Sequence, residues 1–151
     1  MKNESLNAFF VGSLIASVVG AVMLLADDFG GWFFQTTYAG VPLDRYGSIG
    51  LFTVYSPIVA VLAAAMLYSG YVSYVVLRSD DSGPSAVSVR RAYNSSVAAF
   101  GATVALAVIF AIVMSTQDVE EWWLGGGFYG AAVGSALSAV LLKLGLNKIA
   151  D

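Results

Sequence analysis

Four long stretches without a charged residue constrain this chain more than any other feature. They run from Ser5 to Ala26, Tyr46 to Leu77, Ala92 to Gln117 and Trp122 to Leu142. The hydrocarbon core of a bilayer is about 30 Å thick, and a helix needs about 20 mostly apolar residues to cross it. Because every stretch is long enough, the sequence predicts an all-α integral membrane protein built as a bundle of four transmembrane helices.

The composition supports a membrane protein and narrows its chemistry. The chain is 58% hydrophobic and 11% charged, whereas soluble domains carry about 25% charged residues. It has no histidine and no cysteine, which excludes disulfides, thiol chemistry, histidine-ligated haem and the usual zinc sites. The commonest general base is also missing. We therefore expect no catalytic residue, no cofactor and no metal site, and a protein that is not an enzyme.

We expect one membrane domain over residues 1–151, with spans near 7–26, 48–77, 92–116 and 124–147. The outer loops would then cover 27–47 and 117–123, and the inner loop 78–91. The second charge-free stretch is too long for a simple crossing. Either Pro57 kinks a long helix, or Ser56 caps a helix that starts at Pro57. Ser85 is a good N-cap for the third helix.

The basic residues predict the orientation of the bundle. Four spans place both termini on one side, together with the inner loop. That side holds six basic residues: Lys2, Arg78, Arg90, Arg91, Lys143 and Lys148. The opposite side holds only Arg45. Basic residues accumulate in cytoplasmic loops, so we expect a multi-pass plasma-membrane protein with both termini in the cytoplasm. Arg78, Arg90, Arg91, Lys143 and Lys148 would contact lipid headgroups there.

Small residues recur every four positions in the first and fourth spans. The two series are Gly12, Ala16 and Gly20, and Gly126, Gly130, Gly134 and Ser138. Such series form flat helix faces that another helix can approach closely. The two faces should pack either on each other or on a partner protein. A leucine at Gly130 or Gly134 would then disrupt the assembly.

The first outer loop combines strand-forming residues with aromatic ones. Trp32, Phe33, Phe34 and Tyr38 fall in a segment that reads as a strand, and Ala39-Gly40 could turn it back. A short β-hairpin is one interpretation, and an aromatic segment lying on the membrane is the other. Exposed apolar side chains often mark contact sites, so these four residues are candidates for binding a protein or a lipid.

Three further patterns have an ordinary structural interpretation beside a functional one. The outer acids could bind Ca²⁺, but the simpler interpretation is that they cap and orient helices. They are Asp27, Asp28, Asp118, Glu120 and Glu121. Tyr68, Tyr71 and Tyr74 could line a redox site, although tyrosines at a membrane boundary usually form an interfacial belt. Gly125 to Gly127 would be a flexible entry to the fourth span.

The layout resembles that of four-span proteins of the claudin and MARVEL type. The shared features are cytoplasmic termini, a longer first outer loop with aromatic residues, and a short second outer loop. The claudin signature requires a Trp followed by Gly-Leu-Trp and two cysteines, whereas this chain has Gly31-Trp32 and no cysteine. The resemblance therefore concerns the layout and assigns no functional residue.

These observations favour a non-enzymatic membrane subunit. It would assemble through its small-residue helix faces and its aromatic outer loop, with copies of itself or with other membrane proteins. Its other partner would be membrane lipid, and nucleic acid is not expected. The alternative is a small channel or carrier for a neutral solute or ion, with Thr53, Ser56, Asn94 and Ser135 along its path. Abundant Ala, Val and Gly with few lysines is typical of a prokaryotic chain.

Overall fold

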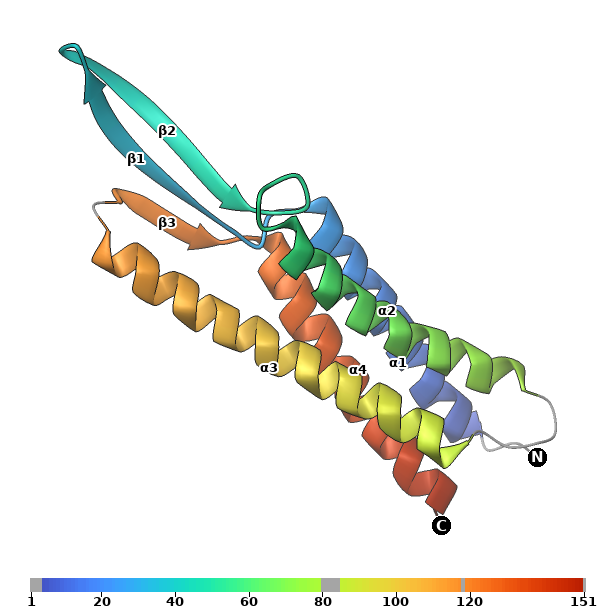
Figure 1. The fold of residues 1–151 in the computed structure, drawn as a ribbon. Helices are drawn as coiled ribbons and strands as arrows, with labels where there is room; N and C mark the ends of the chain where they lie inside the picture. Colours follow the sequence, from blue (N-terminus) through green and yellow to red (C-terminus); the bar gives the residue numbers. More distant parts are fainter. Residues whose placement is uncertain (1–3, 80–84, 118, 151) are drawn as a thin grey trace.

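A computed structural model describes residues 4–79, 85–117 and 119–150 of the chain. Four helices form a bundle, and three strands form a small sheet at one end of it (Figure 1). The helices are α1 (Glu4–Ala26), α2 (Ser56–Arg78), α3 (Ala86–Thr116) and α4 (Gly126–Ala150). The strands are β1 (Gly30–Tyr38), β2 (Val41–Ile49) and β3 (Glu121–Leu124).

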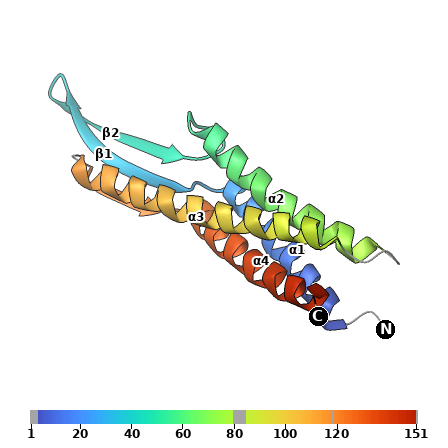
Figure 2. The same ribbon diagram turned by 60° about the horizontal axis from the view of Figure 1, so that its bottom comes forward.

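All four helices are long and apolar enough to cross a membrane. This confirms the predicted set of four candidate spans within a mostly helical chain. Helix α1 begins and α4 ends at the same end of the bundle, which we call the terminal end (Figure 2). The sheet lies at the opposite end, which we call the sheet end. At about 1.5 Å per residue, the 31-residue α3 is about 46 Å long, and its last turns run beneath the sheet.

The boundaries of the second and third helices differ from the predicted spans. Helix α2 begins at Ser56, with Pro57 in its first turn and Tyr55 as N-cap. Pro57 therefore lies in the first turn and does not kink a longer helix, because its missing N–H costs nothing there. Ser56, the predicted cap, is instead the first residue of the helix. Residues 48 and 49, expected in the span, belong to β2. Helix α3 starts at Ala86, six residues before the predicted span, and Ser85 is its N-cap without a side-chain capping bond.

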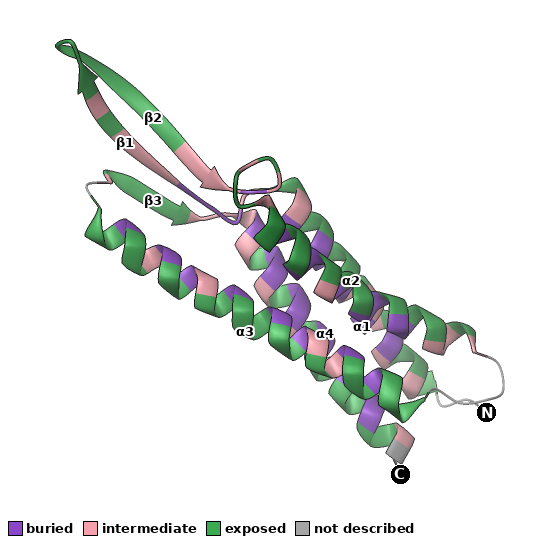
Figure 3. Cartoon of the chain, in the orientation of Figure 1, coloured by how far each residue is buried: buried purple, intermediate pink, exposed green. Residues whose placement is uncertain are grey.

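The interior of the bundle consists of two apolar clusters. The cluster nearer the sheet end includes Leu24, Leu62 and Met66. The cluster nearer the terminal end includes Phe10 and Leu142. The helices turn these side chains inward and leave their other faces exposed, as expected for a bundle surrounded by lipid (Figure 3).

Six buried serines, contributed by all four helices, form a layer between the two apolar clusters. Its members are Ser13 and Ser17 of α1, Ser69 and Ser73 of α2, Ser96 of α3 and Ser138 of α4. The Ser138 hydroxyl lies 2.8 Å from that of Ser13 and accepts hydrogen bonds from Ser17 at 2.9 Å and Ser96 at 3.1 Å. Hydroxyl bonds between helices stabilise membrane bundles because hydrocarbon offers no other partner. The layer therefore ties all four helices together.

The predicted hairpin is present, and it is longer than expected. Strand β1 pairs antiparallel with β2 over nine residues each, and the turn is Ala39-Gly40. Both turn residues have positive φ, 51° at Ala39 and 82° at Gly40. This is the type I′ geometry whose twist matches two-residue hairpins. The hairpin projects past the ends of the helices (Figure 1).

Strand β3 completes the sheet in the order β2-β1-β3. It pairs antiparallel with the first half of β1, so that Trp122 lies opposite Trp32. This strand was not predicted, since residues 117–123 were expected to form only a short outer loop. The four residues of β3 form a strand only because they pair with β1, which is distant in the sequence.

The three glycines at the start of α4, Gly125 to Gly127, make a close contact and are not a flexible entry. A Cβ on Gly127 would lie 2.7 Å from the carbonyl oxygen of Asp27, and a Cβ on Gly126 would strike the Asp27 carboxylate. A side chain at Gly125 would strike the backbone of Asp28. Glycine is required here because the start of α4 packs directly against the chain that leaves α1.

Candidate functional site

The sheet has two faces with different surroundings, and the register assigns every side chain to one of them. Side chains alternate along a strand, and paired residues share a face. One face carries Trp32 and Trp122 and lies on α3, so we call it the inner face. The opposite face carries Phe33, Tyr46 and Trp123, and we call it the outer face.

The inner face packs on α3 through aromatic rings. The ring of Phe110 lies 6.1 Å from that of Trp32 and 5.9 Å from that of Trp122, the latter edge to face. The Trp32 indole also lies against Gly47, and a side chain at position 47 would strike the indole ring. Edge-to-face pairs are favourable beyond the apolar area that they bury. These contacts hold the inner face of the sheet against the last turns of α3.

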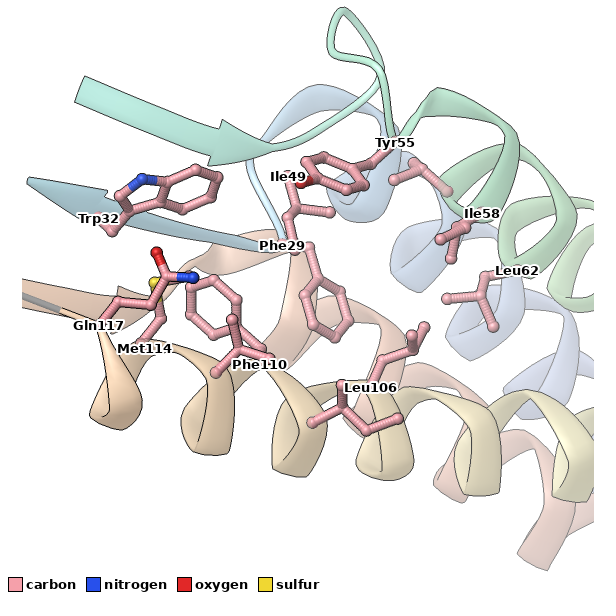
Figure 4. Close-up of a pocket in the computed structure, with 13 residues that line it drawn as sticks. Phe29, Trp32, Ile49, Tyr55, Ile58, Leu62, Leu106, Phe110, Met114 and Gln117 are labelled. Carbon is pink, nitrogen blue, oxygen red and sulfur yellow. The ribbon is translucent and has the colours of Figure 1, made fainter. Parts of the chain in front are cut away.

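An apolar pocket of about 330 Å³ lies beneath the sheet, between α2 and α3. Figure 4 shows Trp32 and Gln117 at the sheet side of the pocket, with Ile58 and Leu62 of α2 on the other side. The complete lining is Phe29, Trp32, Ile49, Tyr55, Ile58, Val59, Leu62, Leu106, Ile109, Phe110, Val113, Met114 and Gln117. Most of these side chains are aliphatic or aromatic. The pocket therefore suits an apolar molecule.

Beyond the end of α3 the inner face continues as a mostly apolar surface that also carries Thr36 and the exposed Arg45. By the register, Phe34, Tyr38, Val41 and Leu43 share the face of Trp32, and we call these four residues the hairpin patch. Tyr38 is 76% exposed and Val41 58%. Leu43 is also exposed, whereas Phe34 is half-buried, and the distal part of the hairpin is largely green in Figure 3.

The outer face is anchored to the end of α1 by a hydrogen bond. The hydroxyl of Tyr46 donates to the Asp28 carboxylate at 3.0 Å, and its ring lies 5.8 Å from that of Trp123. The pKa of Tyr46 is raised above its ordinary value near 10. Partial burial is the larger cause, because it penalises the tyrosinate, and the neighbouring Asp28 carboxylate adds to it.

The structure divides the four predicted outer-loop contact residues between these environments. Trp32 lines the pocket and is half-buried, Phe33 lies on the outer face, and Phe34 and Tyr38 belong to the hairpin patch. Of the four, Tyr38 alone is fully exposed. The sequence grouped them because they are neighbours in the chain, whereas the strand places alternate residues on opposite faces.

The two small-residue faces pack on each other within the chain. A Cβ on Gly134 would lie 2.7 Å from the carbonyl oxygen of Ala16 and 2.8 Å from Gly20 Cα. A Cβ on Gly130 would strike Met23. The other residues of the two series contact different neighbours. Gly12 faces Leu141, Ser138 belongs to the serine layer, and Gly126 lies against the Asp27 carboxylate. A groove of about 570 Å³ follows the seam on its outer side, with Ile15, Val19, Tyr129, Val133 and Leu137 along its rim.

The charged residues sort between the two ends of the bundle. Arg78, Arg90, Arg91, Lys143 and Lys148 are all exposed and lie toward the terminal end. Lys143 lies over the ring of Tyr93, 5.7 Å from its centroid, and Lys148 contacts the Ser5 hydroxyl. Tyr68, Tyr71 and Tyr74 are exposed on α2, and Tyr74 accepts a hydrogen bond from Arg78 at 3.2 Å.

The outer acids do not assemble into a metal site in the part of the chain that the structure describes. Asp27 and Asp28 follow α1 and contact the glycines at the start of α4, and Glu121 pairs with Phe33 in the sheet. Asp118 lies outside the described residues. The Asp27 carboxylate accepts a hydrogen bond from the Asp28 N–H, and the Asp28 carboxylate accepts one from Tyr46, so neither bond caps a helix.

The polar residues expected along a solute path are not brought together. Thr53 is bound within its own turn to Gly50, and Ser56 starts α2. Asn94 is exposed, whereas Ser135 is buried and donates to the Ala131 carbonyl of its own helix. Six of the buried polar side chains form the serine layer, which was not predicted from the sequence, and Thr103 and Ser135 are buried apart from it. Its signal was present as Ser13, Ser17, Ser69, Ser73, Ser96 and Ser138 at helical spacing.

No family model matches the chain, and no curated protein or solved structure is significantly similar to it.

Proposed function

We propose that this chain is a non-enzymatic subunit of a membrane assembly, and that the hairpin patch is its contact surface. The assembly is a homo-oligomer or a complex with other membrane proteins. The observation that carries the proposal is the exposure of Tyr38, Val41 and Leu43 on one face of a rigidly anchored hairpin. Water-exposed apolar clusters on a fixed scaffold are typical of binding surfaces.

The anchoring of the hairpin supports a binding role. A flexible loop loses conformational freedom when it binds, whereas a preformed surface avoids much of that cost. Here the Trp32–Phe110 contact holds the inner face on α3, and the Tyr46–Asp28 bond holds the outer face on the end of α1. The patch is therefore presented at a fixed angle beyond the bundle.

The proposed setting is the plasma membrane, with both termini in the cytoplasm and the sheet outside. The concentration of basic side chains at the terminal end supports this orientation. The groove beside the α1–α4 seam offers a second surface for a partner helix, since Gly20, Gly130 and Gly134 line its floor. A small channel or carrier, the alternative from the sequence, has no comparable observation in its favour.

The test is the mass of the particle extracted from native membrane in mild detergent. Replacing Tyr38, Val41 and Leu43 by serine should reduce the particle to the mass of one chain with its detergent. Thr37→Ser is the matched control, because Thr37 is exposed on the same strand but on the opposite face. The proposal fails if the wild-type particle already has the mass of one chain, or if the triple variant keeps the wild-type mass.

A further inference from the structure

We propose that the base of the sheet lies in the headgroup layer of the bilayer, where Tyr46, Trp122 and Trp123 contact the lipid. The sheet base consists of residues 30–32 of β1 and residues 122–124 of β3, which pair with each other. The inference rests on the proposed membrane setting, and it is independent of an assembly through the hairpin patch. It follows from the level at which the helices leave the hydrocarbon core.

Helix α1 marks the level at which the hydrocarbon core ends. It runs without a charged residue from Ser5 to Ala26, and Glu4 and Asp27 flank this stretch. At 1.5 Å per residue the stretch is about 33 Å long, which matches a hydrocarbon core of about 30 Å. Because charged side chains are costly in hydrocarbon, the core ends at the sheet end of α1.

The serine layer transfers this level to α3. Ser138 accepts hydrogen bonds from Ser17 and from Ser96, so these two residues lie at one level of the bundle. Ala26 is nine residues beyond Ser17, and Ala105 is nine residues beyond Ser96. Helix α3 continues for eleven residues beyond Ala105, which is about 16 Å. Figure 1 shows this overhang of α3 beside the sheet.

The overhang of α3 stays apolar over most of its length. Ile109 and Ile112 are 56% and 60% exposed, and the first polar side chain beyond Ala105 is that of Ser115. A series of exposed aliphatic side chains favours contact with lipid over contact with water. The hydrocarbon core therefore ends near Ala105, and water begins near Ser115, with the headgroup layer between these two levels.

The aromatic contacts of Phe110 place the sheet base within this layer. Phe110 lies midway along the overhang, about 7.5 Å beyond Ala105, and its ring contacts those of Trp32 and Trp122. Trp123 is one strand residue, about 3.3 Å, closer to the bundle. The headgroup layer is about 5–7 Å deep, so Trp123 lies inside it and Trp122 lies at its outer edge.

The side chains at this level are of the kind that membranes concentrate at their interfaces. Tyr46, Trp122 and Trp123 are 61%, 38% and 39% exposed. The Tyr46 ring lies beside that of Trp123, and its hydroxyl reaches Asp28, just beyond the end of α1. Tyrosine and tryptophan combine an apolar ring with a polar tip, which suits the boundary between acyl chains and headgroups. The backbone of β1 is also paired on both sides here, so it needs no water.

The same level determines how far the hairpin patch stands from the lipid. Phe34 is two residues beyond Trp32 and Tyr38 is six, which along the strand is about 7 Å and about 20 Å. The patch therefore extends beyond the headgroup layer. A partner that binds the patch must do so with a part that rises above the membrane.

The experiment measures the depth of Trp123 in the full chain, reconstituted in nanodiscs of phosphatidylcholine. Trp32→Phe with Trp122→Phe leaves Trp123 as the fluorophore and keeps an aromatic ring at both other positions. The probes are phosphatidylcholines that carry bromine either near the headgroup or deep in the acyl chain, because bromine quenches tryptophan at short range. Trp123 should lose more emission with the shallow bromine than with the deep one.

Two control variants calibrate the depth in a chain whose native tryptophans are all replaced by phenylalanine. Phe100→Trp lies on α3 five residues before Ala105, about 7.5 Å inside the core, and should lose more emission with the deep bromine. Tyr38→Trp, at a position that is 76% exposed, should respond to neither lipid and be quenched by aqueous iodide. A Trp123 response equal to that of either control overturns the proposal.

A second measurement keeps all three tryptophans. A nitroxide label on Ile109→Cys should lie at a depth between those of labels on Phe100→Cys and Thr37→Cys, as measured by its relaxation with oxygen and with an aqueous nickel chelate. A depth equal to that of either reference label overturns the proposal. The depth should be the same when Tyr38, Val41 and Leu43 are replaced by serine, so the lipid contact and the assembly fail independently. A shift of the Ile109 label in that variant would show that the sheet base does not meet the lipid by itself.

Discussion

At the scale of single residues, a few close contacts hold the sheet end together. Gly47 leaves room for the Trp32 indole, and Gly127 lets α4 start against the carbonyl oxygen of Asp27. In each case a hydrogen atom in place of a side chain permits the contact. Ala39 differs from these glycines because it has a side chain and still adopts a left-handed conformation, with φ of 51°.

Ala39→Asn should therefore stabilise the hairpin, because asparagine tolerates the left-handed region better than alanine. The expected gain is about 0.5–1 kcal/mol in the free energy of local opening. Amide hydrogen exchange of the β1 and β2 residues measures that opening. Gly40→Ala is the contrasting variant and should speed exchange, since φ at Gly40 is 82°. Faster exchange in Ala39→Asn would contradict the turn geometry.

The bond from Tyr46 to Asp28 should weaken at high pH. Because the pKa of Tyr46 in the folded protein lies above its unfolded value near 10, its stabilising contribution is fully present below pH 10. It is lost as the pH rises through the folded pKa. The carbon-13 shift of the Tyr46 ring, assigned by its loss in Tyr46→Phe, should titrate with a midpoint above 10. Asp28→Asn should lower that midpoint, and an unchanged midpoint would show that the carboxylate has no influence.

At the scale of elements, the α1–α4 seam and the serine layer determine how the helices pack. The seam is close because glycines of both helices face each other's backbone. The serine layer then fixes the register, since Ser138 meets hydroxyls from α1 and α3 at one level. Apolar side chains alone can slide past one another in lipid, whereas a hydroxyl must meet its partner.

Gly134→Leu should destabilise the single chain, because α4 would have to move away from Ala16 and Gly20. An overpacked contact between two backbones costs about 3 kcal/mol. Thermal unfolding in mild detergent, followed by circular dichroism, measures the loss. Gly101→Leu is the matched control, since a Cβ at Gly101 in α3 meets no atom within 4 Å. From the small-residue pattern alone, such a variant was expected to break an assembly. A smaller particle with an unchanged melting temperature would support that interpretation against the intramolecular one.

Ser138→Ala should remove the centre of the serine layer. Hydrogen bonds between membrane helices contribute about 0.6 kcal/mol on average and at most about 1.7, so the loss should be about 1–2 kcal/mol. The same unfolding measurement applies. Ser115→Ala serves for comparison, because Ser115 is exposed and donates to Ala111 of its own helix. Equal melting temperatures for the two variants would show that the layer contributes no stability.

At the scale of the whole molecule, the chain is a bundle with two chemically different ends. The terminal end is basic, and the sheet end is acidic and carries the pocket and the hairpin patch. Such asymmetry fits a protein with a fixed orientation in its membrane.

Labelling of single cysteines tests the orientation, and the absence of natural cysteine leaves no background. Thr37→Cys on the hairpin should react with a membrane-impermeant maleimide in intact cells. Ser85→Cys, which precedes α3 at the terminal end, should react only after the cells are permeabilised. The reverse pattern would place the termini outside and contradict the distribution of basic residues as a guide to orientation.

The sequence by itself determined the four apolar helices and the hairpin. Spans follow from charge-free length, and a hairpin follows from strand-forming residues around Ala39-Gly40, because both signals are local. The sequence alone did not decide where α2 begins, because Ser56-Pro57 is compatible with a kink inside a long helix and with the start of a new helix. Tertiary structure decided that the small-residue faces of α1 and α4 meet each other. It also decided that β3 exists, that the face of Trp32 packs on α3, and that six serines share one layer. Each of these depends on which distant segments lie side by side, and a hydrophobic pattern does not specify the partner of a helix face or of a strand.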